Sequence, residues 1–276
     1  MPDPGLFEHV PYPEYASWPA ANGSLLEHFR KSAAHAREEM LHPKAPTKAL
    51  DFGIAVHSAI FEPDKFADLY AVAPECDRRY KEGKAIWAEF EAEHPRATII
   101  KADDGDAIRG IAQSIAAHPM ASQLVAAPGL NEVSIRWTHE FNDVPCKGRL
   151  DRLAKFAGWS IVVDLKTTED ASPLGFPRAV ASYGYHRKAA FYLDGLNTLA
   201  PMVRRFFHIA AEKTPPYAVA VYELGESALI QGRAENRVNL DKYKQAMETG
   251  EWPAYSTEIE PLDLPNWAQR MEESNV

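Results

Sequence analysis

The stretches Gly148-Arg149-Leu150-Asp151 and Ile161-Val162-Val163-Asp164-Leu165-Lys166 decide the fold of this chain. The second is a β-branched run that ends in two charges, which is typical of a central strand with a site at its tip. Asp164 follows Asp151 by 13 residues, so the two acids can sit at the ends of adjacent strands. Because residues i and i+2 of a strand point to one face, Asp164 and Lys166 project together, and a hairpin brings Asp151 beside them.

Two carboxylates and a lysine at this spacing allow two interpretations. Neighbouring acids repel each other, and a divalent cation is the natural compensation. Oxygen ligands favour Mg²⁺ or Mn²⁺ over zinc. A lysine beside such an ion can orient or deprotonate a water for in-line attack on a phosphodiester. The alternative is a structural ion pair between Lys166 and Asp164 or Asp151 at a strand edge.

The familiar motifs of other enzyme classes are absent from the sequence. It contains no glycine-rich nucleotide-binding pattern, no H-E-x-x-H and no G-x-S-x-G, so nucleotide-binding folds, zincins and hydrolases with a nucleophile elbow lose their usual signatures. The two cysteines, Cys76 and Cys146, cannot build a disulfide framework or a four-cysteine cluster. We therefore expect no iron–sulfur cluster.

The composition is that of a globular protein. In 276 residues, 46% are hydrophobic and 25% are charged, which suffices for a large core. No apolar run approaches the roughly 18 residues of a membrane span, so we expect no membrane association. The first residues lack the basic and apolar regions of a secretion signal, and we expect a cytoplasmic protein.

Charge is distributed unevenly along the chain. The net charge is −9, yet residues 146–213 hold 11 Lys and Arg against 6 Asp and Glu. A basic middle on an acidic protein permits a buried anion-binding groove and argues against a broadly basic surface.

Hydrophobic periodicity predicts one domain of class α/β (α+β), with a central mixed β-sheet flanked by helices. The prolines near the start predict an irregular N-terminal arm over residues 1–22, followed by a single domain over 23–276. Helical spacing predicts helices at 23–40, 48–61, 106–117, 185–199 and 226–247. Alternation or short apolar runs predict strands at 132–137, 147–156, 161–165, 203–211 and 217–224.

Two features outside the aspartates favour a functional site. His57 lies in the predicted helix 48–61, and its imidazole could complete a metal site, although a lone helical histidine is more often a core or surface residue. The predicted helix 185–199 opens with basic residues, and its N-terminus would also favour a phosphate.

In this order, the motifs resemble those of the PD-(D/E)XK nuclease superfamily. Within its RecB-like branch, the chain is most similar to the exonuclease VIII (RecE-type) C-terminal nuclease domain of phages and prophages. The resemblance runs through a helical histidine, GRLD, DLKTT and a Y-x-x-x-A-A-x-Y helix. The matching stretches are 46–57, 77–84, 146–168, 185–195 and 250–255. This similarity implies a PD-(D/E)XK nuclease fold.

The resemblance also implies the roles of individual residues. His57, Asp151 and Asp164 are expected to bind the metal, which is Mg²⁺ or alternatively Mn²⁺, together with the backbone carbonyl of Leu165. Lys166 is expected to position the attacking water and to stabilise charge on the phosphate. The implied catalytic residues are thus Lys166, Asp164 and Asp151.

The implied DNA contacts depart from the family pattern at one position. Tyr192 matches the tyrosine of the branch's Q-x-x-x-Y motif, but Lys188 stands in place of the glutamine. Lysine cannot accept a hydrogen bond, although it can contact a phosphate. The full set of predicted DNA contacts is Lys188, Tyr192, Arg149, Thr167, Arg187 and Tyr185. Arg149 could instead be surface charge, Thr167 could cap a turn, and Glu132 could reach a second metal or face solvent.

The activity implied by the resemblance is hydrolysis of linear double-stranded DNA from its ends. Resection from 5′ to 3′ would leave 3′ single-stranded tails for recombination, with a single-strand annealing protein (RecT-like) as a partner and a homo-oligomeric ring as the assembly. Two alternatives remain open. One is a structure-specific or single-strand endonuclease of the same superfamily, and the other is a protein that binds DNA ends without cutting.

Overall fold

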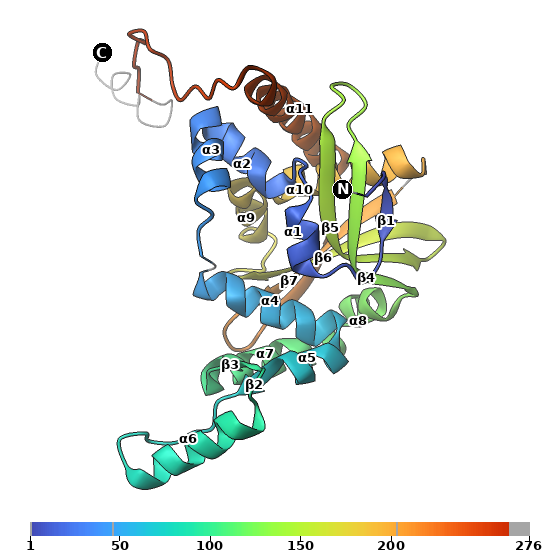
Figure 1. The fold of residues 1–276 in the computed structure, drawn as a ribbon. Helices are drawn as coiled ribbons and strands as arrows, with labels where there is room; N and C mark the ends of the chain where they lie inside the picture. Colours follow the sequence, from blue (N-terminus) through green and yellow to red (C-terminus); the bar gives the residue numbers. More distant parts are fainter. Residues whose placement is uncertain (1, 46, 203, 265–276) are drawn as a thin grey trace, which may run out of the picture.

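A six-stranded sheet forms the centre of the computed structural model, which describes residues 2–45, 47–202 and 204–264 (Figure 1). The strand order is β1-β4-β5-β6-β7-β8, and all neighbours are antiparallel except the parallel pair β6–β7. A parallel pair needs a crossover, which α9 (Phe176–Tyr183) and α10 (Tyr185–Leu199) supply. The strands are β1 (Gly5–Phe7), β4 (Gly129–Thr138), β5 (Pro145–Phe156), β6 (Trp159–Thr168), β7 (Arg204–Glu212) and β8 (Val219–Glu223). The predicted mixed sheet is confirmed.

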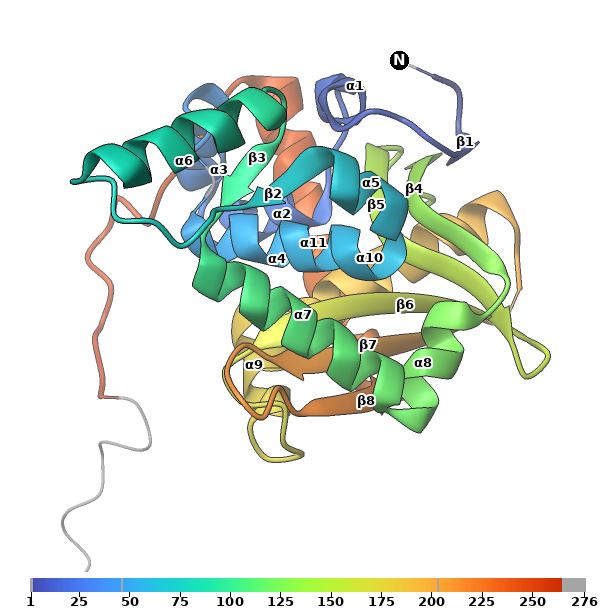
Figure 2. The same ribbon diagram turned by 90° about the horizontal axis from the view of Figure 1, so that it is seen from below.

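Helices cover both faces of this sheet (Figures 1 and 2). Alternate residues of β6 enter two different cores: Val162 joins the core under α10, and Leu165 joins the core under α4. The first core is completed by α2 (Gly23–Lys31), α3 (Ala33–Leu41) and α11 (Glu226–Thr249), and the second by α4 (Lys48–Phe61), α7 (Ala102–Ala117) and α8 (Pro119–Ala126). The flanking helices predicted from periodicity are therefore present on both sides.

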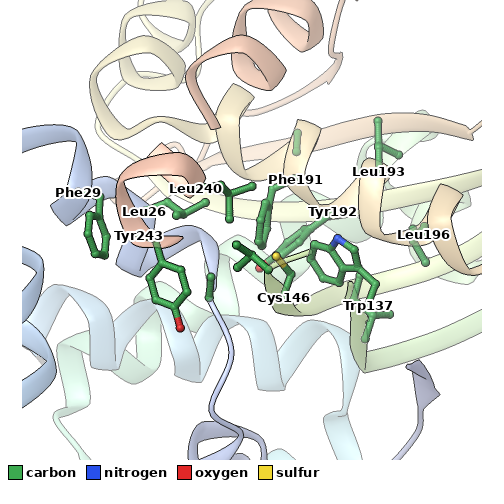
Figure 3. Close-up of a cluster of buried hydrophobic side chains, with 14 of the residues drawn as sticks. Leu26, Phe29, Trp137, Cys146, Phe191, Tyr192, Leu193, Leu196, Leu240 and Tyr243 are labelled. Atoms are coloured by element: carbon green, nitrogen blue, oxygen red, sulfur yellow. The ribbon is translucent and has the colours of Figure 1, made fainter. Parts of the chain in front are cut away.

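The core under α10 is rich in aromatic rings (Figure 3). Trp137 of β4 is fully buried against Phe191 of α10, with ring centroids 4.7 Å apart. Phe29 of α2 contacts Tyr243 of α11 edge to face at 5.6 Å. These contacts tie helices from both ends of the sequence to the same face of the sheet.

A smaller unit stands away from the sheet. The strands β2 (Tyr70–Val72) and β3 (Thr98–Ile100) form a parallel pair next to α5 (Pro63–Leu69). A loop and helix α6 (Lys81–Glu93) connect β2 to β3, and α6 projects away from the rest of the molecule (Figure 1).

The predicted irregular arm over residues 1–22 is wrong. Residues Gly5–Phe7 form the edge strand β1, which pairs with β4, and Tyr12–Ser17 form helix α1. The prolines were misleading because Pro13 occupies the first turn of α1, where a missing N–H costs nothing. The predicted helix 23–40 is likewise two helices, because the extended Ser32 ends α2 and caps α3.

The C-terminal end of the predicted domain, residues 265–276 with Trp267, lies outside the described residues. No helix in the described part of the chain is long and apolar enough to cross a membrane.

Candidate active site

The two aspartates lie where strands β5 and β6 part. The backbone pairing of these strands ends at Arg152 and Val163, one residue short of Asp151 and Asp164. Beyond that point the Leu165 N–H donates to a side chain of β5 instead of to its backbone, because Asp151 Oδ2 accepts it at 2.9 Å. The separation of the strands thus opens a gap in the sheet, and a side chain fills the place of a backbone partner.

His57 reaches this gap from α4. Thr47 caps the start of this helix, with its Oγ1 accepting from Leu50 N at 3.2 Å. His57 Nδ1 lies 3.2 Å from Asp151 Oδ2, and His57 Nε2 lies 2.8 Å from the Leu165 carbonyl oxygen. The structure therefore brings together three of the predicted metal ligands, namely His57, Asp151 and the Leu165 carbonyl.

Glu132 joins this group from β4. Its backbone has a φ of 51°, a left-handed conformation that interrupts the alternation of the strand directly beside Asp151. Ligand atoms of His57, Glu132 and Asp151 all lie within 4.8 Å of one another. Burial, followed by the nearby Asp151 charge, raises the pKa of Glu132, even though Arg149 donates to its carboxylate at 2.8 Å. Two crowded acids with one neutralising arginine leave an excess of negative charge that a cation would offset.

Asp164 has different partners on the other face of β6. It is 2% exposed, and its Oδ2 receives both the Lys166 ammonium and His208 Nδ1, the latter at 3.0 Å. Burial acts to raise the pKa of Asp164, but the charges of Lys166 and His208 outweigh it and hold this pKa well below its ordinary value. Asp164 is thus a fixed anion at neutral pH.

A divalent cation fits this donor set, which consists of carboxylate, imidazole and carbonyl groups. Asp164 is not part of the group formed by His57, Glu132 and Asp151. Lys166 and His208 both contact its Oδ2, however, and its Oδ1 has no hydrogen bond among the described residues, so one oxygen stays available. Glu132, His57 and Asp151 would bind the ion together. Asp164, the residue before Leu165 on β6, would have to reach the ion from the other face of this strand.

Three of the predicted contacts on α10, namely Tyr185, Lys188 and Tyr192, lie near Asp164. Lys166 Nζ lies 5.2 Å from the centre of the Tyr185 ring, and Lys188 Nζ lies 5.5 Å from that of Tyr192. Burial, together with the charge of Asp164, raises the pKa of the Tyr192 hydroxyl. Gly148 of the GRLD stretch makes room for this tyrosine, because a Cβ there would lie 2.8 Å from its ring.

Other predicted DNA contacts are engaged within the protein. Arg187 is 6% exposed and forms ion pairs with Glu27 and Glu235, so its guanidinium is enclosed in the protein rather than presented to a phosphate, which contradicts the prediction for it. Arg149 donates to Glu132 and to the Val10 carbonyl, at 2.8 and 2.9 Å. It was predicted either as a DNA contact or as surface charge, and it lies half-buried between β4 and the N-terminal segment. Thr167 is half-buried on β6.

Two members of the site were underrated or missed by sequence reasoning. The sequence left two alternatives for Glu132, a ligand of a second metal or a solvent-facing residue, because nothing in the sequence indicates its left-handed backbone. His208 was not considered, yet it contacts Asp164 directly. Its signal was available: a lone histidine inside the apolar run Phe206-Phe207-His208-Ile209-Ala210 of a central strand.

Comparisons with known proteins identify the family and the fold of this chain. A profile of the DUF3799 family, described as a PDDEXK-like domain of unknown function, matches residues 23–265. No curated protein matches the sequence. The crystal structure of the protein named "Putative exonuclease" from Eubacterium rectale superposes with a TM-score of 0.61 at 14% identity, over 96% of this chain and 100% of that one. The structure named SSO0001 has a TM-score of 0.29 at 16% identity, over 78% of this chain and 84% of that one. At 14% identity the first likeness is one of fold alone.

Proposed function

Since the chain belongs to the DUF3799 family of PDDEXK-like domains of unknown function, we propose that it is a metal-dependent deoxyribonuclease. One observation carries the proposal. Asp151 with His57 and Asp164 with Lys166 flank the same residue, Leu165, at the point where β5 and β6 separate. An acidic donor set next to a lysine is an arrangement that can support metal-dependent phosphodiester hydrolysis.

The structural ion pair, the alternative left open by the motif, does not account for the whole arrangement. Lys166 does pair with Asp164, but Asp151 and Glu132 remain crowded without a lysine. Arg149 and His57 contact these acids, yet one arginine for two crowded carboxylates leaves an excess of negative charge that the ion pair at Asp164 does not explain.

The residues divide the proposed reaction between them. A bound divalent cation supplies Lewis-acid activation and offsets phosphate charge. Lys166 leaves Asp164 when substrate arrives and directs its ammonium at the phosphate and the attacking water. Lys188 and Tyr185 lie along the same face and would hold the phosphate backbone. Tyr192 keeps its proton because of its raised pKa, so it would donate a hydrogen bond rather than act as a base.

We propose further that the substrate is linear double-stranded DNA, resected from 5′ to 3′ with Mg²⁺ as the working ion. Support comes from the sequence resemblance to RecE-type nucleases and from the fold shared with the Eubacterium rectale protein. A single-strand annealing protein that receives the 3′ tail, and a ring that encloses the duplex, belong to the same proposal.

The test compares a linear, 5′-phosphorylated, end-labelled duplex with the same DNA as a closed circle, with Mg²⁺ or with EDTA. The expected result is loss of the linear DNA alone and only with Mg²⁺. Cutting of the closed circle would show that the protein is an endonuclease, because the circle has no ends. Binding without any cleavage, in Mg²⁺ and in Mn²⁺, would favour a protein that holds DNA ends, and Lys188→Gln would then test the departure from the family motif.

A further inference from the structure

His208 is a buried polar residue to which the proposed reaction gives no task. It lies on β7 in register with Asp164 of the parallel strand β6, and 1% of it is exposed. In-register residues of neighbouring strands point to the same face, so the two side chains meet directly. His208 Nδ1 is 3.0 Å from Asp164 Oδ2.

The hydrogen bond has a defined direction. Asp164 Oδ2 also faces the Lys166 ammonium, so the carboxylate accepts from both partners and His208 Nδ1 carries the proton. The other ring nitrogen, Nε2, is buried without a hydrogen-bond partner among the described residues. An unpaired buried polar atom is unfavourable, so a phenylalanine would suit the packing better than this histidine. What histidine adds at this position is the bond from Nδ1 to Asp164.

Aromatic rings hold the imidazole in place. The ring centres of Phe206, Phe176 and Tyr185 lie 5.1, 5.7 and 5.9 Å from that of His208, and the Phe176 contact is edge to face. A donor fixed in this way holds a carboxylate at one angle, as the outer partners of metal ligands commonly do.

Lys166 and His208 bind the same oxygen of Asp164, but only one of them can stay during the reaction. Lys166 is 14% exposed and has to leave Oδ2 to reach a phosphate or a water. His208 is enclosed and stays. It therefore keeps Oδ2 turned inward, and Oδ1 remains directed away from the two donors while the lysine acts.

We propose that His208 is a positioning residue for Asp164, which it holds in the orientation needed for metal binding after Lys166 has been released. The inference rests on the proposed nuclease function and deepens it, because it assigns the control of this acid to a residue that touches neither DNA nor metal.

Three variants test the inference. His208→Phe keeps an aromatic ring but removes the donor, and the cavity of about 390 Å³ that His208 and Phe176 line has space for the larger ring. His208→Asn places an amide N–H where Nδ1 was. His186→Phe is the matched control, because His186 is also a buried histidine beside this cavity but contacts Glu235 and the Val180 carbonyl instead of Asp164.

Each variant is measured in three ways: the crystal structure without metal, Mn²⁺ binding by calorimetry without DNA, and kcat and KM on linear duplex DNA. In His208→Phe we expect a rotated Asp164 carboxylate, Mn²⁺ affinity lowered about 10-fold or more, and kcat lowered by a similar factor with KM for DNA little changed. His208→Asn should restore Mn²⁺ affinity and kcat to near those of the wild type. His186→Phe should match the wild type in all three.

An unchanged Asp164 orientation together with wild-type Mn²⁺ affinity in His208→Phe would overturn the inference. So would a His208→Asn variant as defective as His208→Phe, since the ring would then matter and not the donor. A wild-type protein that fails to cleave DNA would overturn the proposed function instead, because the crystal structures and Mn²⁺ titrations still decide the role of His208.

Discussion

Asp164 contributes to this protein through both its charge and its orientation. It is almost fully buried, and both Lys166 and His208 approach a single oxygen of it. Asp151, on the neighbouring strand, contacts both His57 and the Leu165 N–H through one oxygen, Oδ2. The two acids of the motif therefore have different tasks, and substitutions should separate them.

Substitution of Lys166 should separate the chemical step from metal binding. In Lys166→Ala we expect kcat on linear duplex DNA to fall by about 10²–10⁴, because the group that handles the water and the phosphate is lost. Mn²⁺ affinity, measured by calorimetry, should stay near that of the wild type. Asp151→Ala should lose both. Lys155→Ala, an exposed change on the same strand as Asp151, serves as the control. Wild-type cleavage by Lys166→Ala would show that the D-x-K assignment is wrong.

The lowered pKa of Asp164 predicts how stability depends on pH in the metal-free protein. A carboxyl whose pKa is lower in the folded state stabilises the fold above its unfolded pKa of about 3.9, and this contribution is lost as the pH falls toward the folded pKa. Asp164→Asn leaves Lys166 without its carboxylate partner, so we expect the free energy of unfolding to drop by about 3–5 kcal/mol at pH 7.

Urea unfolding of the wild type and of Asp164→Asn between pH 7 and pH 3 measures this contribution. The difference between their free energies of unfolding should become smaller as the pH falls below about 4. The exposed substitution Asp68→Asn provides the reference for a carboxyl without buried partners. A gap of constant size from pH 7 to pH 3 would contradict the assignment of Asp164 as the stabilising anion.

At the scale of elements, β5 holds the N-terminal segment through two basic residues. The Lys147 ammonium donates to the carbonyls of Tyr15, Ala16 and Trp18, at 3.0, 2.8 and 2.8 Å, and so binds the C-terminal end of α1. Arg149 donates to the Val10 carbonyl at 2.9 Å. The described residues 2–22 are thus attached to the sheet through β1 and these two side chains, although they lie before the residues that match the family profile.

Lys147→Met tests this anchoring. The variant keeps the apolar stem but leaves three carbonyls without their donor, and we expect the free energy of unfolding to fall by about 3 kcal/mol. Hydrogen exchange of the amides in α1 should increase as well. Lys155→Met, at an exposed position of the same strand, should change neither. Unaltered exchange in α1 after Lys147→Met would mean that β1 and the aromatic contacts hold the segment by themselves.

At the scale of the molecule, several basic residues of the stretch 146–213 form hydrogen bonds and ion pairs inside the protein. Lys147 and Arg187 are buried, and Arg152 is buried against the carbonyls at the end of α8. Among the described residues, Lys166 and Lys188 lie near the proposed site without being enclosed in this way. In the proposed ring, each copy would contribute these two lysines to the DNA path, while the acidic residues that give the chain its net charge of −9 would lie outside it.

The proposed ring makes an oligomer the expected state in solution. Size-exclusion chromatography with light scattering should give a mass of at least two times 30.8 kDa at micromolar protein, and cleavage of long DNA should be processive. A monomer at all concentrations up to tens of micromolar would rule out the ring and leave the active-site proposal intact.

The sequence by itself determined the order of the main elements and the residues at the centre of the site. Hydrophobic period and turn residues depend on neighbours a few positions apart, so α4 was predicted with its observed bounds and β5 to within two residues. The pair Asp164 and Lys166 could be predicted to share a face, because the strand period alone decides that.

Only the tertiary structure decided which groups meet around that pair. His208 is 44 residues from Asp164, and no local pattern reports a contact made through the register of two parallel strands. The left-handed backbone of Glu132 and the burial of Arg187 between two glutamates also depend on distant partners. The physical reason is the same in each case: local periodicity assigns a side chain to a face, whereas packing decides which charged partners it finds there.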